Sequence, residues 1–401
     1  MIEERIPLLK DKHNHISIYS ALIDSLDIQN IKSKNEALSK IKNRKDDISI
    51  ILGWNTGYYK LEDKELNQLH PLIISDLSLH DIKLNKPAKN YLKEEFPELV
   101  ENINNKLWVE RNFSYIMKVL VSLKSLDVDK VNSFYDDLLE NGILYAADML
   151  LPNENSLEIL RKSNISDYTE FWADFETYKD LSDSGKKKVN GIKFFTDGAI
   201  GTNTAAIKDQ YKNGKEGLLL FRDKELREKL VERILENRPL SIHTIGDEAS
   251  EKVLDYLEDI KEKDYDLPYI RMEHCQFVNK EYAEKAKKLG INFCMQPTFS
   301  FDSIYYEDRL PEYYIKNNNP FRMLIDEIDF EPGEDLFFGS DGMPHGIYYA
   351  LESCLFPPLD SQKLTLEEFI DGYCVNNMKK GHVDVEIDYE ENKLSTDVVL
   401  K

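Results

Sequence analysis

The sequence predicts an α/β protein built on a (β/α)8 TIM barrel. Short apolar runs typical of buried strands alternate with stretches rich in Glu, Lys and Leu, which is the pattern of a parallel sheet with crossover helices. Eight such runs occur, the number that closes a barrel. Several of them end in a polar side chain of a metal-binding type, as expected at the carboxyl end of barrel strands, where active sites lie.

The first strand ends at His13. The remaining seven are predicted, in chain order, at 142–148, 168–175, 191–197, 240–244, 269–274, 290–296 and 336–341. Helices are expected between them, for example at 224–237, 248–261 and 280–288, where apolar residues recur three or four positions apart. No repeat, low-complexity tract or Pro/Gly-rich linker divides the chain. We therefore expect one barrel domain over residues 1–375.

Residues 48–109, between the first two strands, are too many for an ordinary loop of a (β/α) barrel. We expect them to form an insertion over the active-site face, as a lid or a wall for the substrate.

Composition excludes several functional classes. No apolar stretch is long enough to span a bilayer and no secretory signal is evident, so we expect a cytoplasmic protein that does not bind membranes. Its 52 basic and 74 acidic residues give a net charge of −22, which disfavours nucleic acid and favours a small-molecule substrate. This charge serves solubility more often than recognition of a cationic substrate. The four cysteines lack CxxC spacing and are expected to be reduced.

Histidines supply the clearest signal of a metal site. His13 and His15 are two residues apart where the first strand ends, so their side chains point to the same side and both imidazoles can face one ion. His243 and His274 each end a later apolar run. The alternative for the His13 and His15 pair is a surface location, and the alternative for His243 or His274, taken singly, is a core or turn histidine. Their recurrence at strand ends favours metal ligands.

Two further residues extend this set. Asp341 ends the run Leu336–Phe338 and could bind metal and accept a proton from water, although an Asp before Gly is also a common turn residue. Lys193 lies inside an apolar run, where a buried ammonium is costly without a partner. A neutral amine there could react with carbon dioxide to give a carbamate that bridges two cations. The alternative is a lysine paired to a nearby carboxylate.

Taken together, these motifs resemble the amidohydrolase superfamily, most closely the branch of N-substituted formamide deformylase and related metal-dependent hydrolases. The likeness runs along nearly the whole chain. It is carried by KDKHNH, DLSLHDIKLN, GIKFFTDGAIGTNTAAI, SIHTIGD, RMEHCQ, CMQPTFS and FGSDGMP, which occur in the order of the family.

The resemblance implies a binuclear centre, usually of two zinc ions. His13, His15 and Asp341 would surround one ion, His243 and His274 the other, and carboxylated Lys193 would bridge them. A metal-bridged hydroxide would attack an amide carbonyl, and Asp341 would pass the proton to the leaving amine. The resemblance also suggests that His80 contacts the substrate. It further suggests that Asp197, Arg271 and Glu273 orient the ligands or close the pocket.

The sequence departs from the family in the small β-sandwich that normally precedes the HxH motif, because this motif begins at residue 13. We expect a truncated remnant of that sandwich at the termini, with residues 376–401 as its C-terminal part. The closing strand Ser395–Leu400 would be unpaired or would join a partner chain, which makes a homodimer reasonable.

Three functions remain open at this stage. The first is hydrolysis of a C–N amide-type bond. The second is the same binuclear centre used on another bond, as in a deaminase, an esterase or a phosphoesterase. The third is a non-catalytic barrel that binds a ligand.

Overall fold

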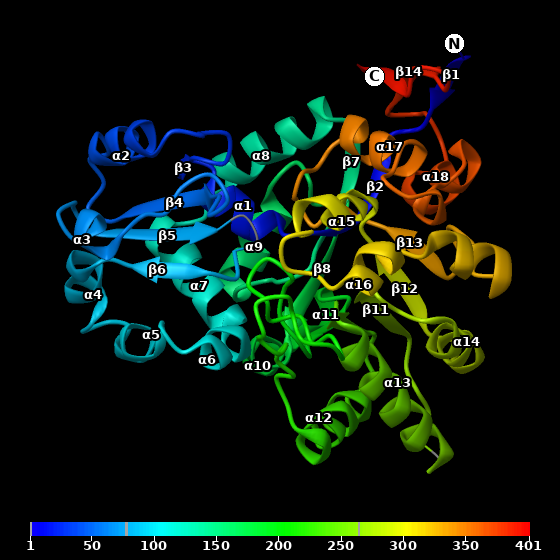
Figure 1. Ribbon diagram of the computed structural model, residues 1–401, viewed down its shortest axis with the longest axis horizontal. Coiled ribbons are helices and arrows are strands. Elements are labelled where there is room, and N and C mark those ends of the chain that lie inside the picture. Colours follow the sequence, from blue (N-terminus) through cyan, green and yellow to red (C-terminus); the bar gives the residue numbers. More distant parts are fainter. Residues whose placement is uncertain (1, 77–78, 264) are drawn as a thin grey trace. The chain divides into compact units, whose positions relative to one another are not determined.

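The computed structural model describes residues 2–76, 79–263 and 265–401. The chain divides into two compact units: Met1–Ser17 together with Val128–Lys401, and Ile18–Asp127. The first unit contains the barrel strands and both chain termini (Figure 1). Within the described residues, no helix combines the length and the apolar character needed to cross a membrane.

The first unit is built around an eight-stranded sheet in the order β13-β12-β11-β10-β9-β8-β7-β2, in which neighbouring strands run parallel. All eight predicted strands are present. They are β2 (Leu9–Asn14), β7 (Ile143–Asp148), β8 (Thr169–Asp174), β9 (Gly191–Phe195), β10 (Leu240–Thr244), β11 (Ile270–His274), β12 (Asn292–Met295) and β13 (Leu336–Phe338). The predicted (β/α)8 barrel is confirmed.

The first and last strands of this sheet meet at a seam. The backbone N–H of Asp341 donates to the carbonyl of His13 over 2.7 Å, and the N–H of Ser340 donates to Oδ1 of Asp11 over 2.9 Å. Gly339 fits here because a Cβ at this position would lie 2.5 Å from the backbone nitrogen of His13. The seam therefore joins the loop after β13 to β2, although the two segments lie more than 320 residues apart.

Helices surround the barrel strands (Figure 1). Those of the first unit are α8 (Val128–Glu140), α9 (Glu154–Lys162), α10 (Phe175–Asp180), α11 (Asp183–Lys188), α12 (Asp223–Leu235), α13 (Asp247–Glu262), α14 (Lys280–Leu289), α15 (Asp302–Tyr305), α16 (Glu312–Asn317), α17 (Ile347–Leu355) and α18 (Leu366–Tyr373). The three predicted helices correspond to α12, α13 and α14.

Helix α14 shows how the sequence sets such boundaries. The side chain of Asn279 accepts a hydrogen bond from the N–H of Tyr282 and caps the first turn. Gly290 ends the helix in the left-handed conformation, with φ of 74°. Ala283 and Ala286 are its buried residues.

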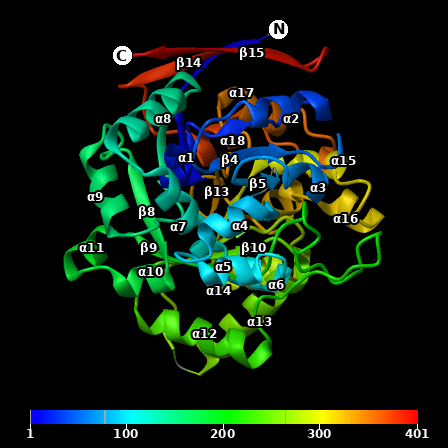
Figure 2. The same cartoon turned by 90° about the vertical axis from the view of Figure 1, so that its left-hand side faces the viewer.

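The termini form a separate antiparallel sheet, in the order β1-β14-β15. Its strands are β1 (Ile2–Ile6), β14 (Gly381–Asp388) and β15 (Lys393–Leu400), which lie together near the labelled chain ends in Figure 2. The predicted β remnant at the termini is thus present. The expectation that Ser395–Leu400 is unpaired is wrong, because β15 pairs with β14 along its whole length. Among the residues that the structure describes, its other edge faces no strand of this sheet, and the alternative that it joins a partner chain stays a prediction. The strand formed by the first residues was not predicted.

The second unit has its own four-stranded sheet, in the order β3-β4-β5-β6, with β6 antiparallel to β5. Its core includes Ile41, Ile51, Trp54 and Ile74. The elements are β3 (Leu26–Asp27), α2 (Lys34–Lys42), β4 (Ser49–Trp54), α3 (Asp63–Leu66), β5 (Leu72–Asp76), β6 (Ile82–Leu84), α4 (Lys86–Leu92), α5 (Pro97–Asn102), α6 (Lys106–Arg111) and α7 (Phe113–Lys124), and α1 (Ile16–Leu22) spans the boundary with the first unit. Residues 48–109 belong to this unit, and their place over the active-site face stays a prediction.

We predict that Gly339→Ala destabilises the protein by about 1–3 kcal/mol, because the new Cβ would overlap the backbone of His13. Chemical denaturation would measure the loss. Gly57→Ala is the matched control, since a Cβ there meets only a side-chain oxygen of Asn55, at 3.0 Å. Equal effects of the two substitutions would show that the seam is not tightly packed.

Candidate metal centre

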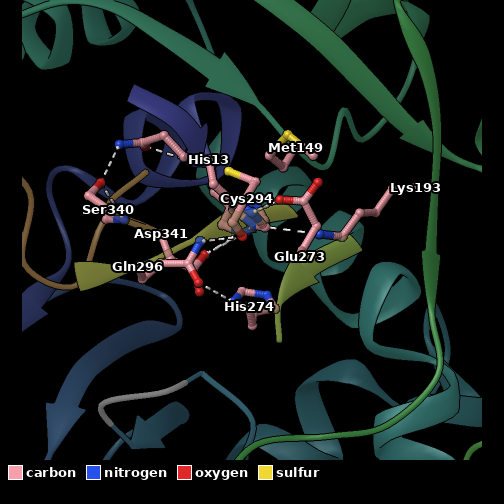
Figure 3. A network of polar contacts seen from close by, with 12 residues as sticks. His13, Met149, Lys193, Glu273, His274, Cys294, Gln296, Ser340 and Asp341 are labelled. Atoms are coloured by element: carbon pink, nitrogen blue, oxygen red, sulfur yellow. Dashed lines mark hydrogen bonds and ion pairs between the residues drawn. The ribbon is translucent and has the colours of Figure 1, made fainter. Parts of the chain in front are cut away.

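The seam brings together three potential metal ligands. Nε2 of His15 lies 3.0 Å from Oδ1 of Asp341, and Nε2 of His13 lies 3.5 Å from the same oxygen. One ligand atom from each residue can be chosen so that all three lie within 4.8 Å of one another. Figure 3 shows His13 and Asp341 directed toward each other from the two sides of the seam.

These distances fit a divalent ion. Nitrogen and oxygen ligands that lie about 2.0–2.2 Å from zinc in tetrahedral geometry are roughly 3.3–3.6 Å from one another. The observed separations of 3.0 and 3.5 Å are close to this spacing. Two imidazoles and one carboxylate are also a donor set that zinc and related metals accept. The residues present therefore suit a metal ion.

Glu273 orients His13. Its Oε2 lies 2.6 Å from Nδ1 of His13, while its Oε1 accepts hydrogen bonds from Arg271 and Ser241, both over 2.7 Å. Burial alone would raise the pKa of Glu273, but Arg271 and His13 hold this pKa well below its ordinary value. Because an ionised carboxylate can only accept, Nδ1 of His13 must donate, which leaves Nε2 to face Asp341.

Cys294 lies within 4.8 Å of ligand atoms of His13 and Glu273. This second group is less suited to a metal, because both oxygens of Glu273 already accept hydrogen bonds. Burial and the nearby Glu273 also raise the pKa of the Cys294 thiol well above its ordinary value. We interpret this group as the support of His13.

Lys193 lies on β9 and is buried, with its Nζ 3.4 Å from Nε2 of His13. Burial lowers the pKa of Lys193 to about 8, against the opposing influence of Glu273 and Asp341. A lysine with this pKa is partly neutral near pH 7, and the neutral amine is the form that reacts with carbon dioxide.

His274 and His243 lie beside this group. The centroid of the His274 ring lies 4.8 Å from that of the His13 ring and 4.6 Å from that of the His243 ring. Nδ1 of His274 lies 2.6 Å from the amide oxygen of Gln296, and Nε2 of His243 lies 3.1 Å from the carbonyl of Gly198. Within the described ranges, neither histidine joins the group of three formed by His13, His15 and Asp341.

The buried imidazoles are held neutral, which metal binding requires. Burial and the positive charge of Lys193 lower the pKa of His13 to about 4, and burial together with His13 lowers the pKa of His274 to about 3.

The other predicted site residues lie in two places. Asp197 accepts hydrogen bonds from the backbone N–H groups of Ala206, Ile245 and Gly246, so it ties the loop after β9 to the loop after β10. His80 belongs to the second unit, where its Nδ1 lies 2.7 Å from Glu110 and its ring stacks on Phe113. Residues 77 and 78 of its motif lie outside the described residues, and a contact of His80 with substrate stays a prediction.

Sequence reasoning missed three supporting residues. Gln296 contacts His274, and Asp148 ends β7 close to the HxH segment. Both end predicted strands in the same way as the metal-type residues, so the same signal could have found them. Asp11 accepts hydrogen bonds from both sides of the seam, from the N–H groups of His13 and Ser340. No sequence pattern marks this role.

We predict that Glu273→Leu, which removes the acceptor of His13 Nδ1, lowers metal affinity 10- to 100-fold, roughly the effect of losing an outer partner of a ligating histidine. It should also destabilise the fold by about 3–5 kcal/mol, because the buried Arg271 would lose its closest counter-charge and keep the more distant carboxylate of Glu170, at 3.8 Å. Calorimetric metal titration and denaturation would measure the two effects.

The double variant Glu273→Leu/Arg271→Met, which also leaves Nδ1 of His13 without this acceptor, separates the two effects. It removes both charges and should recover stability while metal affinity stays low. Recovery of metal affinity would contradict the orienting role of Glu273.

Comparison with known proteins gives a consistent picture. Residues 6–350 match a family described as the amidohydrolase family. The protein YtcJ of Bacillus subtilis (strain 168), which carries the name of an amidohydrolase, is 23% identical over 362 residues, covering 80% of this chain and 67% of YtcJ. A shorter match, 27% identical over 117 residues, covers 28% of this chain and 20% of LONG AFTER FAR-RED 3 of Arabidopsis thaliana.

Two crystal structures share the fold. Both are of uncharacterized metal-dependent hydrolases. The one from Pyrococcus furiosus has a TM-score of 0.65 and 18% identity, covering 92% of this chain and 80% of its own. The one from Pyrococcus horikoshii OT3 has a TM-score of 0.64 and 20% identity, covering 88% and 74%.

Proposed function

We propose that this chain, which belongs to the amidohydrolase family and is therefore a metal-dependent hydrolase, hydrolyses a C–N amide-type bond other than a peptide bond. The observation that carries the proposal is the meeting of His13, His15 and Asp341 at the seam, at distances that suit one divalent ion. The proposed cofactors are two zinc ions, with His243 and His274 beside the second and carbon dioxide held as a carbamate on Lys193.

Divalent metal ions, when bound, would supply activated water at neutral pH and polarise the carbonyl of the substrate. The chain's own residues supply the rest. Burial would raise the pKa of Asp341, yet His13 and His15 hold it far below its ordinary value, so Asp341 is a carboxylate at neutral pH. This carboxylate would accept a proton from water and donate it to the departing amine.

Lys193 supports the proposal through its environment. Its amine is buried beside His13 and its pKa is lowered to about 8. Carboxylation would remove the ammonium and place an anion where imidazoles converge, which would favour binding of cations. A small-molecule substrate, a cytoplasmic location and a homodimer stay predictions from the sequence.

We predict that a strong chelator abolishes hydrolysis of amides, N-formyl amines and N-acyl amino acids, and that zinc with bicarbonate restores it. A panel that also contains esters, phosphoesters and nucleobases tests the choice of bond. Turnover of these compounds but not of amides would contradict the proposed bond while keeping the metal-dependent hydrolase. Absence of bound metal and of any turnover would favour a ligand-binding barrel.

Lys193→Ala should lose at least one metal ion per chain together with activity. Asp341→Asn should lower turnover by about 100-fold or more, because an amide cannot accept the proton. Elemental analysis and steady-state kinetics would measure both. Lys188→Ala is the matched control, since Lys188 pairs at the surface with Glu158 over 2.6 Å. Full metal content and rate in Lys193→Ala would refute the carbamate.

A further inference from the structure

Asp148 is a buried carboxylate with one unused oxygen. It ends β7, and its Oδ1 accepts hydrogen bonds from the backbone N–H and the hydroxyl of Ser17, over 3.4 and 3.1 Å. Its Oδ2 is buried and has no hydrogen-bond partner within the described part of the chain. Such an atom is costly, so a partner is expected once the site is fully assembled.

His15 has a buried ring nitrogen that also lacks a hydrogen-bond partner among the described residues. Its Nε2 faces Asp341 at 3.0 Å, while its Nδ1 is buried and also has no hydrogen-bond partner among residues 2–76, 79–263 and 265–401. An imidazole that binds metal through Nε2 carries its proton on Nδ1 and needs an acceptor there.

The two atoms belong to adjacent strand ends. In the β2–β7 pair, Asn14 lies opposite Asp148, and the N–H of Met149 donates to the carbonyl of Asn14 over 2.8 Å. His15 follows Asn14 directly. Burial raises the pKa of Asp148 to about 6, and the hydrogen bond from Ser17 acts against this rise.

In two neighbouring histidines, the ring nitrogen Nδ1 already has an acceptor. Nδ1 of His13 contacts Glu273 and Nδ1 of His274 contacts Gln296, each over 2.6 Å. Both acceptors come from the barrel strands or the residue just after one. Asp148 also ends a barrel strand, opposite Asn14. Of the three histidines, His15 alone has no acceptor for Nδ1 among the described residues.

We propose that Asp148 is a positioning residue whose Oδ2 accepts the Nδ1 proton of His15 and so directs Nε2 of His15 at the metal. The proposal rests on the metal centre proposed above. It gives a different role to Asp148 than to Asp341, because Asp148 would act through His15 and would not touch the metal or the substrate.

The test measures zinc affinity by competition with a chromogenic chelator. Asp148→Leu removes the acceptor and should weaken binding 10- to 100-fold. Asp148→Asn keeps an amide oxygen as acceptor and should lie near the wild-type protein. Asp302→Asn is the control: Asp302 is a partly buried carboxyl whose pKa is raised by burial to about 7, and it accepts from Gln276 instead of a histidine.

The outcomes separate this proposal from the proposed function. Weaker binding in Asp148→Leu alone supports it. Unchanged binding in Asp148→Leu overturns it and leaves the metal centre standing. Absence of zinc binding by the wild-type protein overturns both.

A second measurement covers the case in which Asp148→Leu does not fold. Nitrogen-15 NMR of histidine-labelled, zinc-loaded wild-type protein reports which ring nitrogen of His15 carries the proton, with the resonance assigned by its loss in His15→Asn. A slowly exchanging proton on Nδ1 that shifts in Asp148→Asn is expected. A His15 Nδ1 proton that exchanges freely with water would overturn the proposal.

Discussion

The candidate site depends on the closure of the barrel between β2 and β13. Its first and last strands come from opposite ends of the chain, and the hydrogen bond from the N–H of Asp341 to the carbonyl of His13 holds the two segments at 2.7 Å. Asp341 adopts a left-handed conformation with φ of 57°, and this conformation accompanies a side chain turned toward His13 and His15. This seam is what brings the two imidazoles and the carboxylate to one location.

Burial of charge at the site is balanced by specific partners. Glu273 stays ionised because Arg271 and His13 contact it, and Arg271 further donates to the carbonyl of Lys12 over 3.0 Å. The imidazoles of His13 and His274 stay neutral because burial opposes a second proton. Neutral rings whose Nδ1 atoms are already engaged can present Nε2 to a cation without prior loss of a proton. The supporting residues therefore set the protonation state that metal binding needs.

Much of the barrel could be predicted from the sequence because strand ends carried two signals at once. An apolar run followed by His, Lys or Asp indicated both a buried strand and the edge of the sheet at which that strand ends. The terminal sheet was harder to predict, because β1 carries mixed charge and its pairing with β14 joins residues more than 370 positions apart. The sequence could place Gln296 at a strand end but could not assign it to His274, since the contact between them depends on how adjacent strands are aligned.

The most direct measurement is an anomalous X-ray difference map from crystals of the zinc-loaded protein, recorded on both sides of the zinc absorption edge. We expect a peak about 2.0–2.3 Å from the ligand atoms of His13, His15 and Asp341, the bond lengths typical of zinc. A peak bound instead by Cys294 and Glu273, or the absence of any peak at the seam at full zinc loading, would contradict the metal centre on which the proposed activity rests.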